Sequence, residues 1–196
     1  MGNPNATIYM SLQNIGGREV KVQSVTLTFK HAEGESFSIP GQNYYPTLES
    51  KNPVILPPFR VKPQEVWEHS ILFFKQFNRE DDKLYRSISS NIRSDIFSKK
   101  EIQGKDVYAE ADPVYTNAAN DFFNNRFKWK EGEYTLEISV SAIPEKASLS
   151  KSFRFTLFES DANELKSYAN DYKYGLGVYY FEPEIHSGIS VQIKPI

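Results

Sequence analysis

The chain has 196 residues, of which 39% are hydrophobic and 14% aromatic, a composition that excludes a disordered chain and suits one folded domain. The formal net charge is only −2 and both signs are mixed along the chain, which excludes the basic footprint of a nucleic-acid-binding or membrane-surface protein. The chain has no Cys, so disulfides, thiolate metal sites and Cys nucleophiles are excluded as well.

The N-terminal segment predicts two strands. Hydrophobic and polar residues alternate over residues 8–12, which is typical of a strand with one buried face. Residues 14–17 contain Asn and two Gly and indicate a turn, so we expect residues 6–30 to form a β-hairpin. The alternation slips by one residue near residues 23–24, which predicts a β-bulge there.

Turn residues then dominate until a long strand. Residues 31–65 are rich in Pro and Gly, and we expect only short strands around residues 36–39 and 54–56. From Val66 to Phe74 the chain is apolar on both faces, which indicates a strand that is covered on both sides.

The middle of the chain changes to a helical pattern, and we expect a helical insertion at about residues 79–126. Its first helix has an apolar stripe in which every fourth residue is hydrophobic: Leu84, Ile88, Ile92 and Ile96. A second helix begins at Asp112-Pro113, because Asp is a good N-cap and Pro a good first helical residue. Its expected apolar face comprises Val114, Ala118 and Phe122.

Strands return in the last third. Residues 133–140 alternate most regularly, and a further strand is expected over residues 152–157. A third helix is expected from Ser160 or Asp161, with Asp161 and Glu164 at capping-box spacing and an apolar face of Leu165, Tyr168, Ala169 and Tyr172. The last two strands are expected at residues 178–181 and 188–193.

The order of these elements predicts a mainly β fold. We expect residues 1–196 to form a single domain, a two-sheet antiparallel sandwich with two or three inserted short helices. No apolar run reaches the roughly 18 residues needed to cross a bilayer, so we expect no membrane insertion within this chain.

Two stretches carry a resemblance to a known family. Residues 12–22 resemble the strand–turn–strand opening of immunoglobulin-like domains from bacterial surface and exported proteins, and residues 129–140 resemble a late strand of such domains. In that family a Tyr at the position of Tyr134 often hydrogen-bonds to the preceding loop. The resemblance implies an immunoglobulin-like sandwich that adheres, binds a ligand or acts as a spacer, often outside the cytoplasm.

Catalytic and metal-binding patterns fail in their sequence context. Residues 148–151 match the Ser-x-x-Lys motif of serine β-lactamases, but they lie in a loop that enters a strand instead of at a helix start. The acids at residues 80–82 fit the first turn of a helix better than a calcium loop. Of three His, His69 could pair with Glu65 and His186 with Glu184, but a metal site needs three or four ligands. We therefore assign no catalytic residue, metal ligand or cofactor.

Aromatic residues give the positive functional signal. Exposed aromatic side chains in loops are platforms for sugars, peptides or proteins, and Tyr44, Tyr45, Tyr174 and Tyr179 are the candidate ligand-binding residues. The alternative is that the Tyr residues of segment 168–180 pack a helix against the sheet.

The resulting hypothesis is a non-catalytic binding or spacer domain. It is expected in an extracytoplasmic or membrane-anchored protein, with a protein or a glycan as partner. One alternative is a hydrolase that uses carboxylates brought together by the fold. Enzymatic activity is therefore left open, with a non-catalytic domain favoured. A second alternative is a structural subunit that assembles through an edge strand.

Overall fold

The structure is a computed structural model that describes residues 1–104 and 108–196. The chain divides into two compact units, and each is described by itself. The helical unit comprises Met1–Asn3, Gln76–Glu131 and Phe158–Ser190, and the β unit comprises Pro4–Lys75, Gly132–Leu157 and Val191–Ile196.

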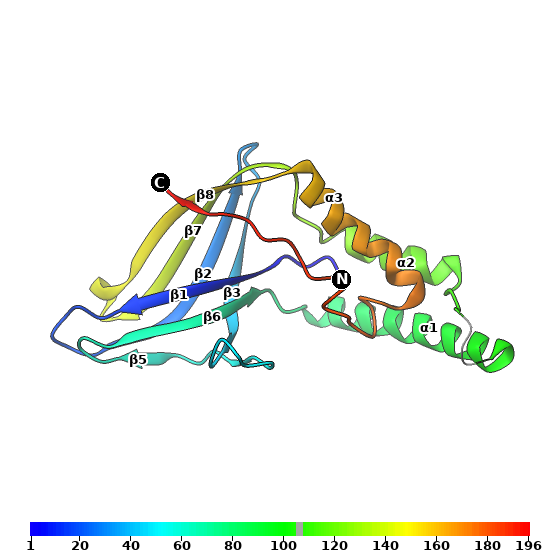
Figure 1. The fold of residues 1–196 in the computed structure, drawn as a ribbon, viewed down its shortest axis with the longest axis horizontal. Coiled ribbons are helices and arrows are strands. Elements are labelled where there is room, and N and C mark those ends of the chain that lie inside the picture. The colour runs from blue at the N-terminus through cyan, green and yellow to red at the C-terminus, as the bar shows by residue number, and fades with distance from the viewer. Residues whose placement is uncertain (105–107) are drawn as a thin grey trace. The chain divides into compact units, whose positions relative to one another are not determined.

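The β unit is one nine-stranded antiparallel sheet in which β1, β6, β3, β2, β7, β8 and β9 are neighbours in that order (Figure 1). The short strands β4 and β5 pair with β3 and β2, respectively. The strands are β1 (Asn5–Gln13), β2 (Val20–His31), β3 (Ser36–Tyr45), β4 (Val54–Ile55), β5 (Phe59–Val61), β6 (Val66–Phe74), β7 (Gly132–Ile143), β8 (Leu149–Leu157) and β9 (Lys194–Pro195).

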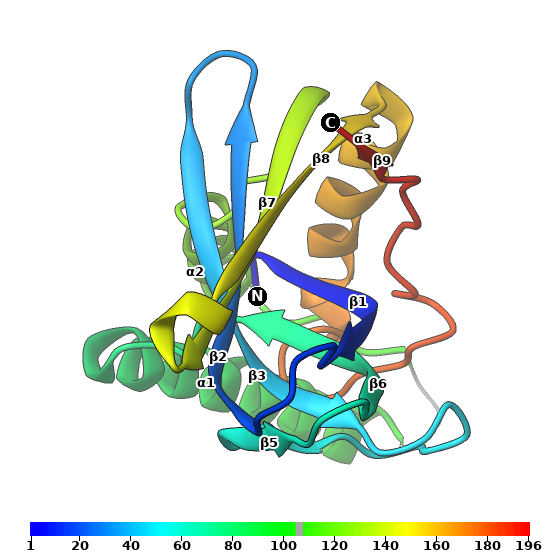
Figure 2. The ribbon, with the colours of Figure 1, turned by 90° about the vertical axis from the view of Figure 1, so that its left-hand side faces the viewer.

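Strand β3 bends the sheet, because its two halves pair with different neighbours. Residues 36–40 pair with β2, and residues 41–45 pair with β6. The ladder to β6 is irregular between Gly41 and Asn43, and a Cβ atom on Gly41 would lie 3.1 Å from the Ile71 side chain. A strand that passes from one ladder to another at such an irregularity turns a corner of the sheet. The β unit is therefore a curled half-barrel, in which β1 lies across from β8 (Figure 2).

The core of the β unit lies inside this curl. On β7 the residues that alternate inwards are all buried, namely Tyr134, Leu136, Ile138, Val140 and Ala142. On β2 the buried residues change phase between Val22 and Val25, where the register to β7 shifts. The predicted bulge at residues 23–24 is thus confirmed.

The helical unit has its own apolar core. It contains α1 (Arg79–Gln103), α2 (Pro113–Asn124), α3 (Glu159–Ser167) and the 3₁₀ segment η2 (Tyr168–Tyr174), whereas the short η1 (Glu145–Ala147) belongs to the β unit. Its core combines the α1 stripe with one face of α2, with η2 and with the segment that follows η2: Ile88, Ile92, Ile96, Ala119, Phe122, Phe123, Tyr172 and Val178.

The helix starts follow the sequence signals. The Asp112 side chain accepts a hydrogen bond of 2.8 Å from the Val114 N–H, and Pro113 is the first residue of α2, as predicted. The acids Glu80, Asp81 and Asp82 lie in the first turn of α1, where the helix dipole stabilises negative charge.

The comparison with the predicted elements is mixed. The mainly β antiparallel class with inserted helices is confirmed, as are the strands at residues 66–74, 133–140 and 152–157. The hairpin at residues 6–30 is wrong, since β1 pairs with β6 and β2 pairs with β3, β5 and β7. The two final strands are also wrong, because only Lys194–Pro195 is a strand after β8.

Two details of the helices also differ. On α2 the expected face is wrong, because Val114 is 71% exposed and the buried residues are Ala119, Phe122 and Phe123. In α3 the N-cap is Phe158, and Asp161 lies one turn in, where its carboxylate accepts from the Phe158 N–H. No helix in residues 1–104 or 108–196 is both long and apolar enough to span a membrane.

Candidate functional site

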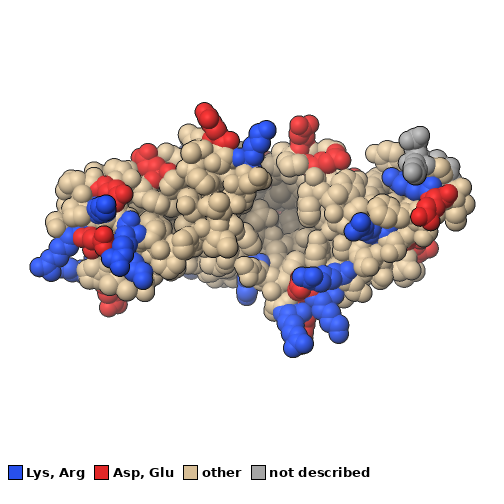
Figure 3. Space-filling view, turned by 90° about the horizontal axis from the view of Figure 1, so that it is seen from below, with Lys and Arg blue, Asp and Glu red and all other residues tan. Residues whose placement is uncertain are grey.

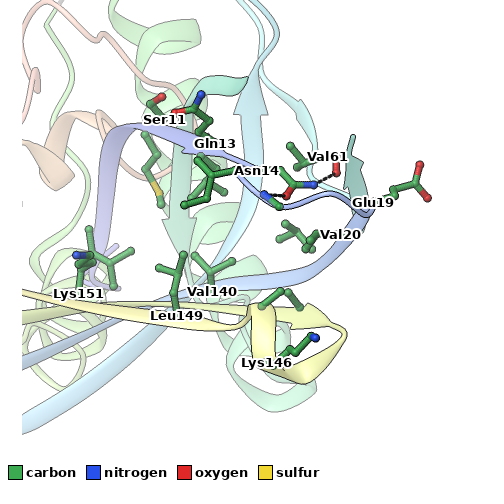
Figure 4. A pocket seen from close by; sticks show the side chains of 18 of the residues that line it. Ser11, Gln13, Asn14, Glu19, Val20, Val61, Val140, Lys146, Leu149 and Lys151 are labelled. Atoms are coloured by element: carbon green, nitrogen blue, oxygen red, sulfur yellow. Dashed lines mark hydrogen bonds between the residues drawn. The ribbon is translucent and has the colours of Figure 1, made fainter. Parts of the chain in front are cut away.

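The β unit contains an apolar trough of about 1480 Å³ on the inner side of the sheet. One wall is β1 with the turn that follows it, residues 8–20. The floor is β7, with Ile138, Val140 and Ala142, and the opposite wall is the start of β8 with Ile193. Figure 4 shows Val140 and Leu149 pointing into the space between β1 and β8.

The trough exists because the inner face of β8 is covered at only one end. Leu157 and Phe155 are buried, Phe153 is half-buried, and Leu149 is 44% exposed, although all four alternate on the same face of the strand. Lys151 shares this face between Leu149 and Phe153. Burial of apolar surface is favourable, so uncovered apolar residues inside a curl of sheet are a place where a ligand gains the same free energy.

The rim of the trough at the end of β1 is held by Asn14, which is buried. Its side-chain amide donates to the carbonyl of Arg18 (2.9 Å) and to that of Val61 (2.8 Å), and its Oδ1 accepts from the Gly16 N–H at 3.0 Å (Figure 4). The Asn14 backbone N–H also donates to the Glu65 carbonyl. These bonds fix the turn after β1, so this wall of the trough is preformed.

Charges at the trough are mainly positive. Arg18, Lys146 and Lys151 all line it and take part in no ion pair within the described residues. The acid at the rim, Glu19, forms a salt bridge with Arg60. Elsewhere the two signs are interspersed, as on the face in Figure 3. The trough thus combines aliphatic walls with unneutralised positive charge.

The four Tyr residues singled out in the sequence are all half-buried and lie outside the trough. Tyr44 belongs to an aromatic cluster on the β unit, with its ring 4.9 Å from that of His69, and the Tyr45 carbonyl lies 3.1 Å from His69 Nδ1. In the helical unit, the Tyr174 hydroxyl donates to Glu110, and Tyr179 packs against the apolar core.

The structure does not bring these four residues into one site. Tyr44 and Tyr45 are consecutive strand residues and therefore point to opposite faces. Tyr174 and Tyr179 are separated by Gly175, whose positive φ of 84° turns the chain between them. The side chains of Tyr44, Tyr174 and Tyr179 each have a packing or hydrogen-bonding role of their own, and ligand binding by any of the four residues stays a prediction.

The carboxylates whose pKa is shifted each accept hydrogen bonds. Bonds from Lys173 and the Tyr174 hydroxyl lower the pKa of Glu110, and bonds from Ser150 and Ser139 lower that of Glu137. Burial opposes ionisation of Asp95, but bonds from Lys99 and a backbone N–H outweigh it and lower its pKa. A general acid in glycoside hydrolysis needs a raised pKa, which is the opposite direction.

Histidines and acids form pairs but no metal cluster. His186 Nε2 lies 2.9 Å from Asp171 Oδ2, so the expected partner Glu184 is wrong, and the ring stacks on Tyr168. This pair lies in the helical unit and lines neither the trough nor the smaller cavity between α1 and α2. Among residues 1–104 and 108–196, no three His, Cys, Asp or Glu side chains come together as a possible metal site.

Sequence reasoning missed the trough, although its residues carried a signal. The sequence predicts a loop at Leu149 and one strand of a hairpin at residues 8–12, and neither prediction shows that these residues are walls of one cavity. The available signal was the composition of β1, which has nine residues and no charge. Comparison with known proteins adds no relative: no family model, no curated protein and no solved structure matches this chain.

Proposed function

We propose that the β unit is a non-catalytic binding module and that its binding site is the apolar trough between β1 and β8. The observation that carries this proposal is a cavity of about 1480 Å³ lined by aliphatic side chains that the fold itself leaves uncovered. Uncovered apolar surface in a concave, preformed site is the usual mark of a ligand-binding site.

The chemistry of the walls favours a protein partner over a glycan. Sugars are bound by aromatic platforms together with several polar groups. Among the described residues, the lining of the trough has only two aromatic residues, Tyr9 and Phe153, and most of its wall is aliphatic, as at Ile8, Val140 and Leu149. Apolar side chains of a partner protein would gain about 25 cal/mol for each Å² that they bury there.

Kinship with immunoglobulin-like domains, and a place in a surface or exported protein, belong to the same proposal. Supporting features are the antiparallel pairing throughout and the passage of β3 between two ladders. The fold departs from a two-sheet sandwich in one respect. Its strands follow one another in a single curled sheet, so the ladders on the two sides of β3 are not separate sheets. The location outside the cytoplasm rests on the sequence resemblance alone.

A carboxylate-based hydrolase is less well supported by the same structure. Such an enzyme needs two acids, or an acid and a His, that face a cavity. The Asp171–His186 pair faces neither of the two cavities described, and the shifted carboxylates Asp95, Glu110 and Glu137 have lowered pKa values.

The test is an NMR titration of the methyl-labelled protein with the apolar anionic dye 8-anilinonaphthalene-1-sulfonate. We expect shifts of the trough methyls of Ile8, Leu12 and Leu149, and none at Ile92 in the helical core. Leu149→Glu should weaken dye binding about tenfold, because a carboxylate replaces apolar contact surface and repels the anion. The control is Leu48→Glu, the same change at a residue that is 81% exposed in a loop. Equal affinities of the two variants, or shifts confined to other methyls, would refute the proposal.

A further inference from the structure

Strand β1 is a free edge of the sheet. Its nine residues pair with β6 in a regular antiparallel register, and in the described part of the chain it has no other strand partner. In such a ladder alternate residues direct both their N–H and C=O groups to the neighbouring strand, and the residues between direct theirs away.

The phase of this alternation follows from the hydrogen bonds at the end of the ladder. Asn14 continues the register of β1 and donates its N–H to the Glu65 carbonyl. The backbone N–H and C=O groups of the even-numbered residues of β1 therefore point to β6. The β3–β4 ladder gives the same result independently. Leu56 donates to the Gln42 carbonyl, so the backbone groups of Gln42 point to β4 and those of the next residue, Asn43, point to β6. Following the registers from β3 to β6 and from β6 to β1, the even-numbered residues of β1 again direct their backbone groups to β6.

The backbone groups of the odd-numbered residues therefore point outwards from the sheet. These residues are Thr7, Tyr9, Ser11 and Gln13, and all four are exposed. Tyr9, Ser11 and Gln13 also line the trough. A row of backbone donors and acceptors without a strand partner thus runs along the β1 side of the apolar trough.

This edge lacks the usual protection against pairing with another strand. Proteins blunt their edge strands with Lys, Pro, bulges or short length. β1 has nine residues, NATIYMSLQ, with no charged residue, no Pro and no register shift along its ladder. The opposite edge is different, since β9 and Ile196 cover part of β8 and Lys151 points towards the trough.

We propose that β1 receives an extended, acidic segment of a partner protein as an additional strand, which rests on the function proposed for the trough. The outward groups of Thr7, Tyr9, Ser11 and Gln13 bind the backbone of this segment, and every second side chain of the segment enters the trough. Strand addition of this kind gives affinity through main-chain bonds and specificity through alternate side chains.

A second copy of this chain is a poorer occupant than a partner segment. The apolar side chains of β1 itself, Ile8, Met10 and Leu12, already line its own trough. The other face of β1 carries Thr7, Tyr9 and further polar residues, so β1 of a second molecule has no free apolar row to insert. The occupant must bring such a row.

The charges at the trough select an acidic segment. Arg18, Lys146 and Lys151 line the cavity without a charged partner among the described residues, while Glu19 is neutralised by Arg60. Acidic side chains that flank the apolar row of the segment would lie near these cations, and opposite charges steer and orient a partner. Binding should therefore weaken as salt is added.

The first experiment is a selection from phage-displayed random peptides of about 12 residues, which is long enough to span β1. Expected winners alternate apolar residues and contain Asp or Glu. The most enriched peptide, labelled with fluorescein, then serves as the probe. No enrichment, or winners that are basic or lack the alternation, would overturn the proposal.

Amide hydrogen exchange of the wild-type protein with this peptide locates the new strand without any variant. The amides of Tyr9, Ser11 and Gln13 should change from fast to slow exchange on binding, whereas that of Met10 is protected by β6 in both states. Protection of the Ser150 amide instead would place the segment on β8 and contradict the proposal. Slow exchange of the β1 amides in a self-associated form without peptide would assign the edge to a second copy.

Two variants of one residue separate the backbone from the side chain. Ser11→Pro removes an outward N–H and should weaken binding of the peptide about tenfold, since Pro is tolerated only where a strand edge has no partner. Ser11→Ala keeps the N–H and loses only the side-chain bond to Glu68, so its affinity should stay within about twofold. Equal affinities of the two variants would overturn the proposal.

A third variant covers the case in which Ser11→Pro does not fold. Lys146→Glu combined with Lys151→Glu changes two exposed side chains and should weaken the peptide about tenfold at low salt. If the dye binds in the trough but no peptide does, strand addition fails and the binding module stands. If neither binds there, both proposals fail.

Discussion

Leu149 and Leu136 offer a matched test of whether the trough is open in solution. Both are Leu residues on the inner face of the sheet, on the paired strands β8 and β7. Leu136 is 1% exposed, whereas Leu149 is 44% exposed. The same substitution, Leu→Ala, therefore removes the same atoms from a closed core in one case and from a trough wall in the other.

The two substitutions should differ by about 2 kcal/mol in the free energy of unfolding. Leu→Ala at a fully buried site costs about 2–5 kcal/mol, because a cavity adds to the lost transfer free energy. Full burial of a Leu side chain is worth about 1.5–3 kcal/mol, and Leu149 is only about half buried, so Leu149→Ala should cost about 1 kcal/mol. No new cavity forms there, because the trough already adjoins that side chain.

The measurement is urea unfolding followed by the fluorescence of Trp67, which lies in β6. The chain has two Trp, so Trp129→Phe is included in every variant to remove the signal from the helical unit. The slope of the free energy against urea should stay constant, so that the midpoint reports stability. If Leu149→Ala and Leu136→Ala lowered the free energy of unfolding equally, the inner face of β8 would be covered in solution. The trough would then not be open to a ligand.

Two further predictions concern a close backbone contact and pH. Gly132→Ala should destabilise the β unit by about 2 kcal/mol or more, since φ is +133° and the new Cβ would lie 2.6 Å from the buried His31 ring. Gly34→Ala, also at positive φ but with nothing within 4 Å, should cost less in the same urea assay. For Asp95, a lowered pKa means stability that is present above the ordinary carboxyl pKa and is lost as pH falls through the lowered value. The wild type should therefore lose more stability between neutral and acidic pH than Asp95→Asn, and an equal loss would show that the carboxylate and its bond to Lys99 contribute nothing.

Local features of the fold could be predicted because a few neighbouring residues decide them. The N-cap at Asp112 needs only a side chain two residues before an unpaired N–H. The bulge at residues 23–24 appears in the sequence as a change in the phase of hydrophobic residues, and the register shift between Val22 and Ser24 follows from it. In both cases the physical cause lies within the same short segment.

Strand pairing could not be predicted, because distant residues decide it. The turn at residues 14–17 resembled a hairpin turn, and consecutive strands often pair. The Asn14 side chain instead donates to the Val61 carbonyl, 47 residues away, and Asn14 continues the ladder between β1 and β6. A turn signal states that the chain changes direction and not which strand it meets.

The C-terminal segment failed for a different reason. Residues 178–181 are Val and aromatic residues, which favour strands, but Gly175 and Gly177 both have positive φ and turn the chain before Val178, which is fully buried. These residues pack as a turn in the helical core, where the Tyr85 hydroxyl donates to the Val178 carbonyl at 2.7 Å. Residue types that favour strands therefore mark a buried segment here without forming a strand ladder.

The candidate site combines both kinds of information. The absence of charge in Asn5–Gln13 can be read from the sequence, and for a central strand it would need no explanation. Only the strand order places β1 at an edge, where the same composition leaves backbone donors and acceptors beside an apolar cavity. A sequence that keeps an edge strand long, regular and uncharged gives up protection against association. The simplest physical reason for retaining such an edge is that a partner strand covers it in the functional state.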